Sequence, residues 1–212
     1  MPASEGFPPA IEVATEAIAI VDIVDATKMS NRFGWYAVGR GVLRDLRSLI
    51  AQVGPKRGLS CQKSTGDGYL LTFRNQQSAE LAAILAVESI FELFDLAVRR
   101  NTGVPEEQAL VLRSAVHIGE VDVLPNDREG PHVSFAFRHE AISRAALAEA
   151  INPIAPEDLP LQNYVLCSEP VADILRQRAT RWTPVSIGLF RFKGFTGFHE
   201  VFRVNPTPAP PC

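Results

Sequence analysis

Apolar residues along this chain of 212 residues follow two spacings, one typical of strands and one typical of helices. Short apolar or alternating runs predict strands over residues 17–21, 58–65, 69–73, 109–123, 164–167, 186–192 and 199–204. Apolar residues three and four positions apart predict helices over residues 29–53, 77–100, 133–150 and 171–178. The order predicts an α+β domain with a ferredoxin-like βαββαβ core and a C-terminal extension.

The ends of the chain differ in composition from the region between them. Residues 1–15 are polar and contain prolines, and residues 205–212 are rich in proline. We therefore expect a flexible N-terminus over 1–15, a single folded domain over 16–204 and a disordered tail over 205–212. A length of 212 residues suits one domain with a sizeable core.

Composition excludes several classes of partner. The net charge is -3, from 21 basic and 24 acidic residues, and no basic cluster follows a helix or loop, which argues against nucleic acid. No apolar run approaches the roughly 20 residues needed to span a bilayer, so we expect no membrane segment. The first nine residues lack the pattern of a signal peptide, and the three cysteines have no metal or redox spacing. These features predict a soluble protein of the cytoplasm.

Two aspartates are candidate metal ligands. Asp22 ends the first apolar strand, and Asp67 lies in the turn Gly66-Asp67-Gly68 between two predicted strands. Glycine on both sides permits a tight turn in which a backbone or ligand approaches closely. Carboxylate oxygens suit Mg²⁺ or Mn²⁺ bound together with substrate phosphates. From these residues alone, an ordinary Asp-Gly hairpin with an unrelated acid elsewhere is the alternative.

A series of short motifs occurs in a fixed order between these elements. They are Ile20-Val21-Asp22-Ile23 with Thr27, Lys63-Ser64-Thr65-Gly66-Asp67-Gly68, Arg113 with His117-Ile118-Gly119-Glu120-Val121, Asp127 with Gly130 and Val133-Ser134-Phe135-Ala136-Phe137-Arg138, and Phe192-Lys193-Gly194-Phe195. In this order they resemble the catalytic domain of class III nucleotidyl cyclases over about residues 16–204.

The resemblance implies a reaction in which the ribose 3′-oxygen attacks the α-phosphate and pyrophosphate leaves. It implies that Asp22 and Asp67 hold two Mg²⁺ or Mn²⁺ ions, and that the backbone at Ile23 and its neighbours lines the phosphates. It assigns Arg138 to the charge that develops in the transition state and Lys193 to the β- and γ-phosphates.

The positions that match the family's base selectors are Lys63 and Asp127. A lysine donor beside a carboxylate acceptor matches the edge of adenine and, equally, that of cytosine, whereas uracil and guanine show the reverse order. The compact chain also resembles the pyrimidine cyclases of bacterial antiphage (Pycsar) defence. We therefore expect a cyclase for UTP or CTP in antiviral signalling, with adenylate cyclase as the alternative.

The family builds each active site across a head-to-tail dimer, and this chain carries both halves, so the resemblance implies a homodimer. Ser134 stands where the family usually has an asparagine that orients the ribose. That difference motivates an alternative of another class, a catalytically silent module that binds nucleotide and dimerises. Two simpler interpretations also stay open: Arg138 as a surface arginine paired with Glu140 or Glu149, and His117 as a hydrogen-bonded strand histidine.

Overall fold

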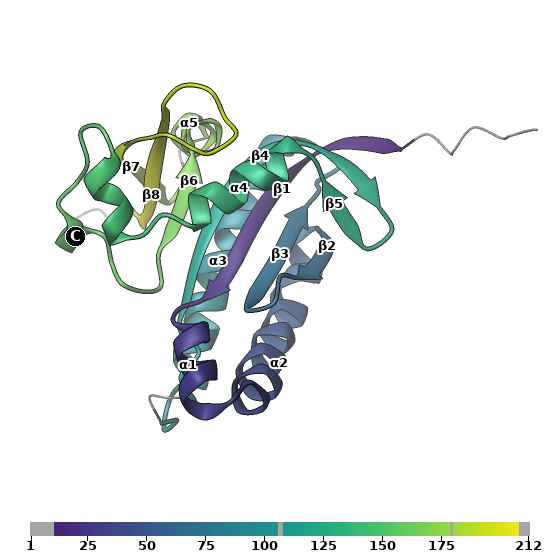
Figure 1. Ribbon diagram of the computed structural model, residues 1–212. Coiled ribbons are helices and arrows are strands. Elements are labelled where there is room, and N and C mark those ends of the chain that lie inside the picture. The colour runs from purple at the N-terminus through teal and green to yellow at the C-terminus, as the bar shows by residue number, and fades with distance from the viewer. Residues whose placement is uncertain (1–10, 106–107, 179, 208–212) are drawn as a thin grey trace, which may run out of the picture.

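The computed structural model describes residues 11–105, 108–178 and 180–207, and Figure 1 shows their arrangement around one twisted sheet. Of the flexible N-terminus expected over 1–15 and the disordered tail expected over 205–212, residues 1–10 and 208–212 lie outside the described residues. Residues 205 and 206 belong to the last strand, so the tail was predicted to begin too early. The strands are β1 (Glu12–Ile23), β2 (Leu59–Ser64), β3 (Gly68–Phe73), β4 (Leu112–Leu124), β5 (Asp127–Glu129), β6 (Val165–Ser168), β7 (Trp182–Phe190) and β8 (His199–Pro206). The helices are α1 (Ala26–Phe33), α2 (Trp35–Val53), α3 (Ala79–Arg100), α4 (Pro131–Glu140) and α5 (Glu169–Gln177).

The strand order of the sheet is β2-β3-β1-β4-β6-β8-β7, and β5 pairs with β4 outside this path. Its first four strands pair antiparallel in the ferredoxin-like order, which confirms the predicted α+β core. The C-terminal extension continues the same sheet, because β6 pairs parallel to β4 and antiparallel to β8. The core and its extension therefore share one layer of strands.

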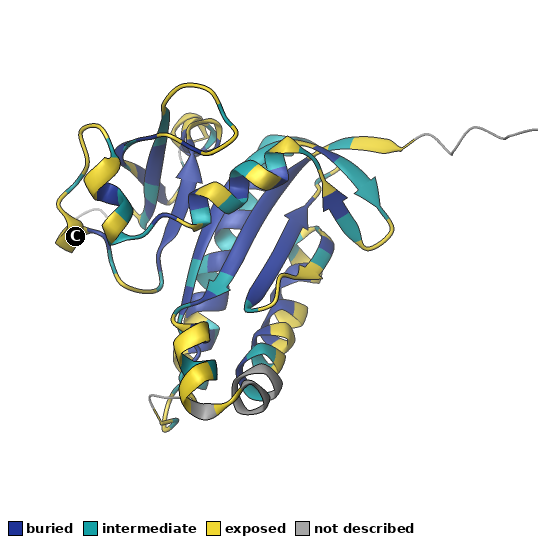
Figure 2. Cartoon of the chain, in the orientation of Figure 1, coloured by how far each residue is buried: buried dark blue, intermediate teal, exposed yellow. Residues whose placement is uncertain are grey.

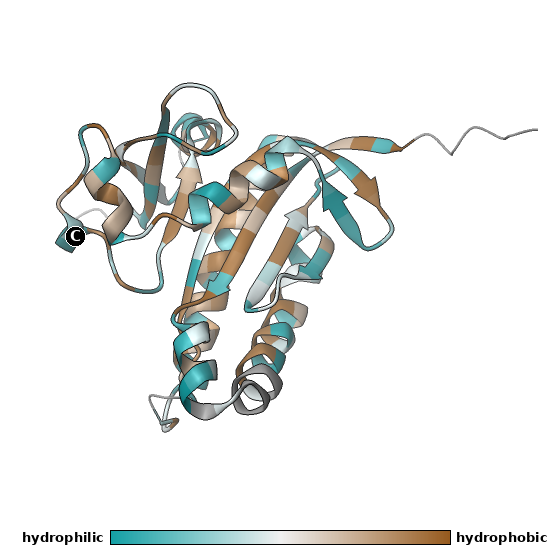
Figure 3. Ribbon diagram, viewed as in Figure 1, coloured by the Kyte–Doolittle hydropathy of each residue, from teal (hydrophilic) through white to brown (hydrophobic). Residues whose placement is uncertain are grey.

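The two faces of β1 are both buried but have different neighbours. Ala17, Ala19 and Val21 face the large core formed with α2 and α3, whereas Ile18 and Ile20 face a smaller core closed by α4. Figure 1 shows α4 crossing in front of β1 and β4 with α3 behind them, and Figure 2 shows both central strands buried. A strand buried on both sides accounts for the continuous apolar run, seen in brown in Figure 3.

Several predicted boundaries were wrong. Residues 29–53 do not form one helix: the chain turns at Gly34, whose φ of 84° favours glycine, and α1 and α2 lie on either side. The helix expected over 133–150 is α4 followed by a separate 3₁₀ helix at Arg144–Glu149. Residues expected to form a loop at 125–131 include the short strand β5. The first strand begins at Glu12, ahead of the expected domain start at residue 16.

None of the helices in the described part of the chain is both long and apolar enough to cross a bilayer. Cys61 and Cys167 are buried free thiols.

Candidate active site

Asp22 and Asp67 are brought together by the pairing of β1 with β3. Asp22 lies opposite Gly68 in the antiparallel ladder, and Asp67 directly precedes Gly68. The backbone N–H of Ile23 donates to the carbonyl of Asp67 across 3.3 Å, which fixes the turn against the end of β1. A Cβ on Gly68 would lie 2.1 Å from the carbonyl oxygen of Val21, so only glycine permits this approach.

Two neighbours of opposite charge, Arg113 and Asp67, act on the carboxylate of Asp22. Burial raises the pKa of Asp22; the guanidinium of Arg113 opposes this, and the negative charge of Asp67 adds to it. Arg113 Nη2 lies 2.8 Å from Asp22 Oδ2. The acids therefore lie close enough to repel each other, as expected of ligands that share a cation.

Glu140, at the end of α4, completes this charged group. Its Oε1 lies 2.7 Å from Arg113 Nε. Burial raises the pKa of Glu140 to about 7, with Arg113 opposing the rise and the two aspartates adding to it. Glu140, one of the two acids considered as surface partners of Arg138, is paired with Arg113 in the structure. The sequence singled out Arg113 as part of a motif but assigned no role to the pair.

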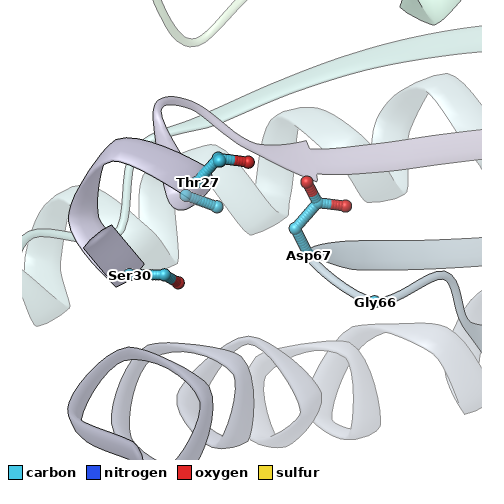
Figure 4. A pocket seen from close by; sticks show the side chains of 5 residues that line it. Thr27, Ser30, Gly66 and Asp67 are labelled. Carbon is cyan, nitrogen blue, oxygen red and sulfur yellow. The ribbon is translucent and has the colours of Figure 1, made fainter. Parts of the chain in front are cut away.

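A cavity of about 330 Å³ opens beside Asp67, lined by Ala26, Thr27, Ser30, Gly66 and Asp67. Figure 4 shows the carboxylate of Asp67 directed toward the gap between the turn and α1, with the hydroxyls of Thr27 and Ser30 on the opposite wall. Residues of the first turns of α1 thus form the wall that faces the acid. A helix start with free amides suits phosphate oxygens.

The expectation that the backbone at Ile23 and its neighbours lines the phosphates stays a prediction. The side chain of Ile23 is buried in the core with α2 and α3, and its N–H already bonds the carbonyl of Asp67. The N–H of Val24 bonds the carbonyl of Val111. The neighbours that reach the cavity are Ala26 and Thr27.

Among the described residues, no group of three or more histidine, cysteine, aspartate or glutamate side chains could hold a metal ion. Asp22 and Asp67 offer two carboxylates, which are hard oxygen donors. This set fits Mg²⁺ or Mn²⁺, which keep several waters and take further ligands from substrate phosphates.

Lys63 and Asp127 lie in direct contact although 64 residues separate them in the sequence. Lys63 is near the end of β2, Asp127 begins β5, and the lysine Nζ donates to Asp127 Oδ2. The hydrogen bond to Asp127 raises the pKa of Lys63. Burial tends to raise the pKa of Asp127. The hydrogen bonds from Lys63 and from the backbone N–H of Arg128 outweigh burial and hold this pKa below its usual value. A charged donor and a charged acceptor therefore stand side by side.

Ser134 and Arg138 are one turn apart on the exposed side of α4, whose buried residues are Val133, Ala136 and His139. Arg138 and Glu140 differ by two positions, or about 200° around a helix of 3.6 residues per turn. Since Glu140 reaches Arg113 and Asp22, Arg138 points away from the acids of its own chain.

Lys193 is exposed in the segment between β7 and β8. In the part of the chain that the structure describes, no hydrogen bond or ion pair joins Arg138 or Lys193 to Asp22 or Asp67. The structure thus assembles the acids and the Lys63–Asp127 pair, but leaves Ser134, Arg138 and Lys193 exposed and apart from them.

All four histidines of the chain gather beside α4. His117 Nδ1 lies 2.8 Å from Ser168 Oγ and its Nε2 lies 2.9 Å from His132 Nδ1, which bears out the interpretation of His117 as a hydrogen-bonded strand residue. His139 Nδ1 donates to the carbonyl of Phe135 across 2.9 Å, while its buried Nε2 has no partner among the described residues. Burial lowers the pKa of His117 to about 3 and that of His139 to about 4.

The chain resembles known proteins in sequence over part of its length and in fold over most of it. No family model matches the sequence. A curated protein of Rhizobium meliloti (strain 1021) named "Putative adenylate cyclase 3" is 36% identical over 81 residues, which are 38% of this chain and 13% of that protein. The chain therefore spans a small part of that relative.

Among solved structures, an adenylyl cyclase from P. aeruginosa superposes with a TM-score of 0.72 at 17% identity, covering 94% of this chain and 97% of its own. The catalytic core of a rhodopsin-guanylyl cyclase with converted specificity, in complex with ATPalphaS, superposes with a TM-score of 0.72 at 18% identity. The match covers 93% of this chain and 99% of that one. An adenylate/guanylate cyclase/hydrolase from Silicibacter pomeroyi superposes with a TM-score of 0.60 at 23% identity, over 93% of this chain and 99% of that one. The chain therefore has the fold of class III adenylyl and guanylyl cyclase catalytic domains, as its motifs predicted.

Proposed function

We propose that the protein is a nucleotidyl cyclase, which converts a nucleoside triphosphate to a 3′,5′-cyclic nucleotide and pyrophosphate. The observation that carries the proposal is the convergence of Asp22 and Asp67 beside a cavity of about 330 Å³, on a sheet that also carries the Lys63–Asp127 pair. The aspartates and their cavity can bind a triphosphate, and the Lys63–Asp127 pair can bind a base.

A divalent cation held by Asp22 and Asp67 would lower the pKa of the attacking ribose hydroxyl and neutralise the phosphates. The chain's own contribution is placement. The turn at Gly68 fixes the acids relative to each other, and the start of α1 lines the space for the phosphates. Thr27 and Ser30 offer hydroxyl donors to phosphate oxygens there.

In this proposal the acids of one subunit act together with the base selectors and the arginine of a second copy of the chain. Arg138 lies about 200° around α4 from Glu140, so it faces away from its own acids and toward solvent. In a head-to-tail homodimer the partner's exposed α4 would bring its arginine and Ser134 to these acids. Lys193 supplies positive charge for the β- and γ-phosphates.

For the base, we propose an edge with a ring acceptor next to an exocyclic amine, which cytosine and adenine share. Because Lys63 and Asp127 already lie side by side as donor and acceptor, a base with this edge can hydrogen-bond to both side chains with little rearrangement. The pyrimidine proposal thus narrows to CTP over UTP, and its antiviral role stays a prediction. Adenylate cyclase is the second candidate, favoured by the relatives described as adenylate or adenylyl cyclases.

The test is a competition assay in which the purified protein receives ATP, CTP, UTP and GTP together with Mn²⁺, and the cyclic products are resolved by mass spectrometry. Formation of cyclic CMP ahead of the others supports the pyrimidine proposal, and cyclic AMP ahead supports the second candidate. Absence of every cyclic product refutes the cyclase and favours the silent module.

A further inference from the structure

A buried ion pair lies on the face of the sheet that carries Lys63. Glu16 of β1 is 0% exposed and Arg128 of β5 is 6% exposed. Arg128 Nε donates to Glu16 Oε2 across 2.8 Å and Nη2 donates to Oε1 across 3.2 Å, so the contact is bidentate. Burial alone would raise the pKa of Glu16, but the hydrogen bonds from Arg128, Thr72 and Ser60 lower it, and the group stays charged.

The guanidinium of Arg128 uses its other N–H groups on the hairpin that presents Asp127. Nη1 donates to the carbonyls of Leu124 and Asp127, across 3.1 and 2.8 Å. These residues pair with each other at the base of the β4–β5 turn. Strand β5 has only three residues, which is too short to fix its own position by ladder bonds. The arginine therefore ties both sides of the turn to β1.

The same carboxylate also holds the strand that carries Lys63. Ser60 Oγ donates to Glu16 Oε2 across 3.1 Å, and the carbonyl of Ser60 lies 3.5 Å from Arg128 Nη2. Ser60 sits at a register shift of β2, where an extra residue leaves its backbone free of the ladder. Lys63 follows three residues later. Glu16 and Arg128 are thus bonded to both segments that supply the Lys63–Asp127 pair.

A buried ion pair contributes little to stability on average, since desolvation offsets the attraction, but it fixes geometry because few arrangements satisfy it. Reading a base edge depends on such geometry, because donor and acceptor must match two atoms of the base at once. Lysine is flexible, and the side chain of Lys63 is 47% exposed, so the precision has to come from Asp127 and from the strand beneath Lys63.

We propose that Glu16 and Arg128 are positioning residues for base selection, which set the separation and direction of Lys63 and Asp127. This inference rests on the proposed nucleotide site. Neither residue needs to touch the nucleotide. The bidentate contact of Arg128 makes the arrangement specific, because a lysine retains the charge but not the planar fork.

The variants for the test are Arg128→Lys and Glu16→Gln, which keep nearly the same volume, with Arg100→Lys as the matched control. Arg100 also donates two N–H groups to one carboxylate, Asp45 Oδ2, across 3.0 and 2.6 Å, but it joins α3 to α2. Thermal unfolding of each variant monitors folding. The readouts are kcat and KM with each nucleotide, equilibrium binding of all four nucleotides, and inhibition by pyrophosphate, which has no base.

We expect Arg128→Lys to raise KM for the preferred nucleotide about tenfold with kcat changed less than about threefold, and to reduce its preference over UTP and GTP by a similar factor. Glu16→Gln should act in the same direction. Inhibition by pyrophosphate should be unchanged, and Arg100→Lys should keep the wild-type base preference. A folded Arg128→Lys protein with unaltered base preference overturns the inference.

The outcomes separate this inference from the cyclase itself. If the wild type forms cyclic product while Arg128→Lys keeps its base preference, the positioning role fails and the cyclase stands. If the wild type forms no product but binds nucleotides with a preference that Arg128→Lys relaxes, the cyclase fails and the positioning role stands. A wild-type protein that neither binds nor converts any nucleotide refutes both.

Discussion

Replacement of His139 by leucine should make the protein more resistant to acid. His139 is buried in α4 between Phe135 and Phe192, and its Nδ1–H is used by the carbonyl of Phe135. A proton could be added only at Nε2, where no described residue accepts a hydrogen bond. The charge of a protonated His199 would also oppose it. The folded state therefore holds this imidazole neutral.

The magnitude follows from the difference between the two states. Burial lowers the pKa of His139 from 6.5 to about 4. Above pH 6.5 both states are neutral at this residue and the full free energy of unfolding is present. As the pH falls from 6.5 toward 4, only the unfolded chain binds the proton, and stability is lost at about 1.4 kcal/mol per pH unit. Between pH 6.5 and pH 5, His139 should cost about 2 kcal/mol.

The assay is urea unfolding of wild type and His139→Leu at constant ionic strength between pH 7.5 and pH 5. Other groups titrate in this range, Glu140 among them, so the quantity of interest is the difference between the two proteins. On going to pH 5, the difference in the free energy of unfolding should shift by about 2 kcal/mol in favour of the leucine variant. Parallel pH profiles, or an NMR titration of His139 with a midpoint near 6.5, would refute the reasoning.

Two further predictions concern the turn and the dimer. Gly68→Ala should lower the free energy of unfolding by about 1–3 kcal/mol, because its Cβ would meet the carbonyl of Val21, whereas Gly41→Ala, with nothing within 4 Å of the new Cβ, should not destabilise the protein in urea unfolding. Asp67→Asn and Arg138→Ala should each abolish cyclisation, but an equilibrated equal mixture should regain about a quarter of wild-type activity, since half the dimers then hold one intact site. No recovery on mixing would contradict a site shared between subunits.

The sequence predicted the fold because the strands carry long, continuous apolar runs. Strand β1, buried on both faces, shows such a run, and the order of strands and helices then restricts the topology. Local backbone features were missed. The break at Gly34 falls inside a helical pattern, and β5 has the composition of a polar loop.

The sequence also found the acids and the Lys63–Asp127 pair, because these positions lie in ordered motifs. It could not find the residues that hold them. Glu16 is bonded to Ser60, Arg74 and Arg128, which are distant in the chain and follow no spacing. A single glutamate next to an apolar strand was a weak signal, and only the folded sheet shows that it is buried.

The most direct measurement of the central claim is the formation of 3′,5′-cyclic nucleotide and pyrophosphate by the purified protein with Mn²⁺, for wild type and for Asp22→Asn and Asp67→Asn. The account predicts product from wild type, in equal amounts of cyclic nucleotide and pyrophosphate, and about a hundredfold less or lower from either variant, since each removes a carboxylate from the proposed cation site. Wild-type activity that survives either substitution, or no product from any of the four ribonucleotides, would contradict it.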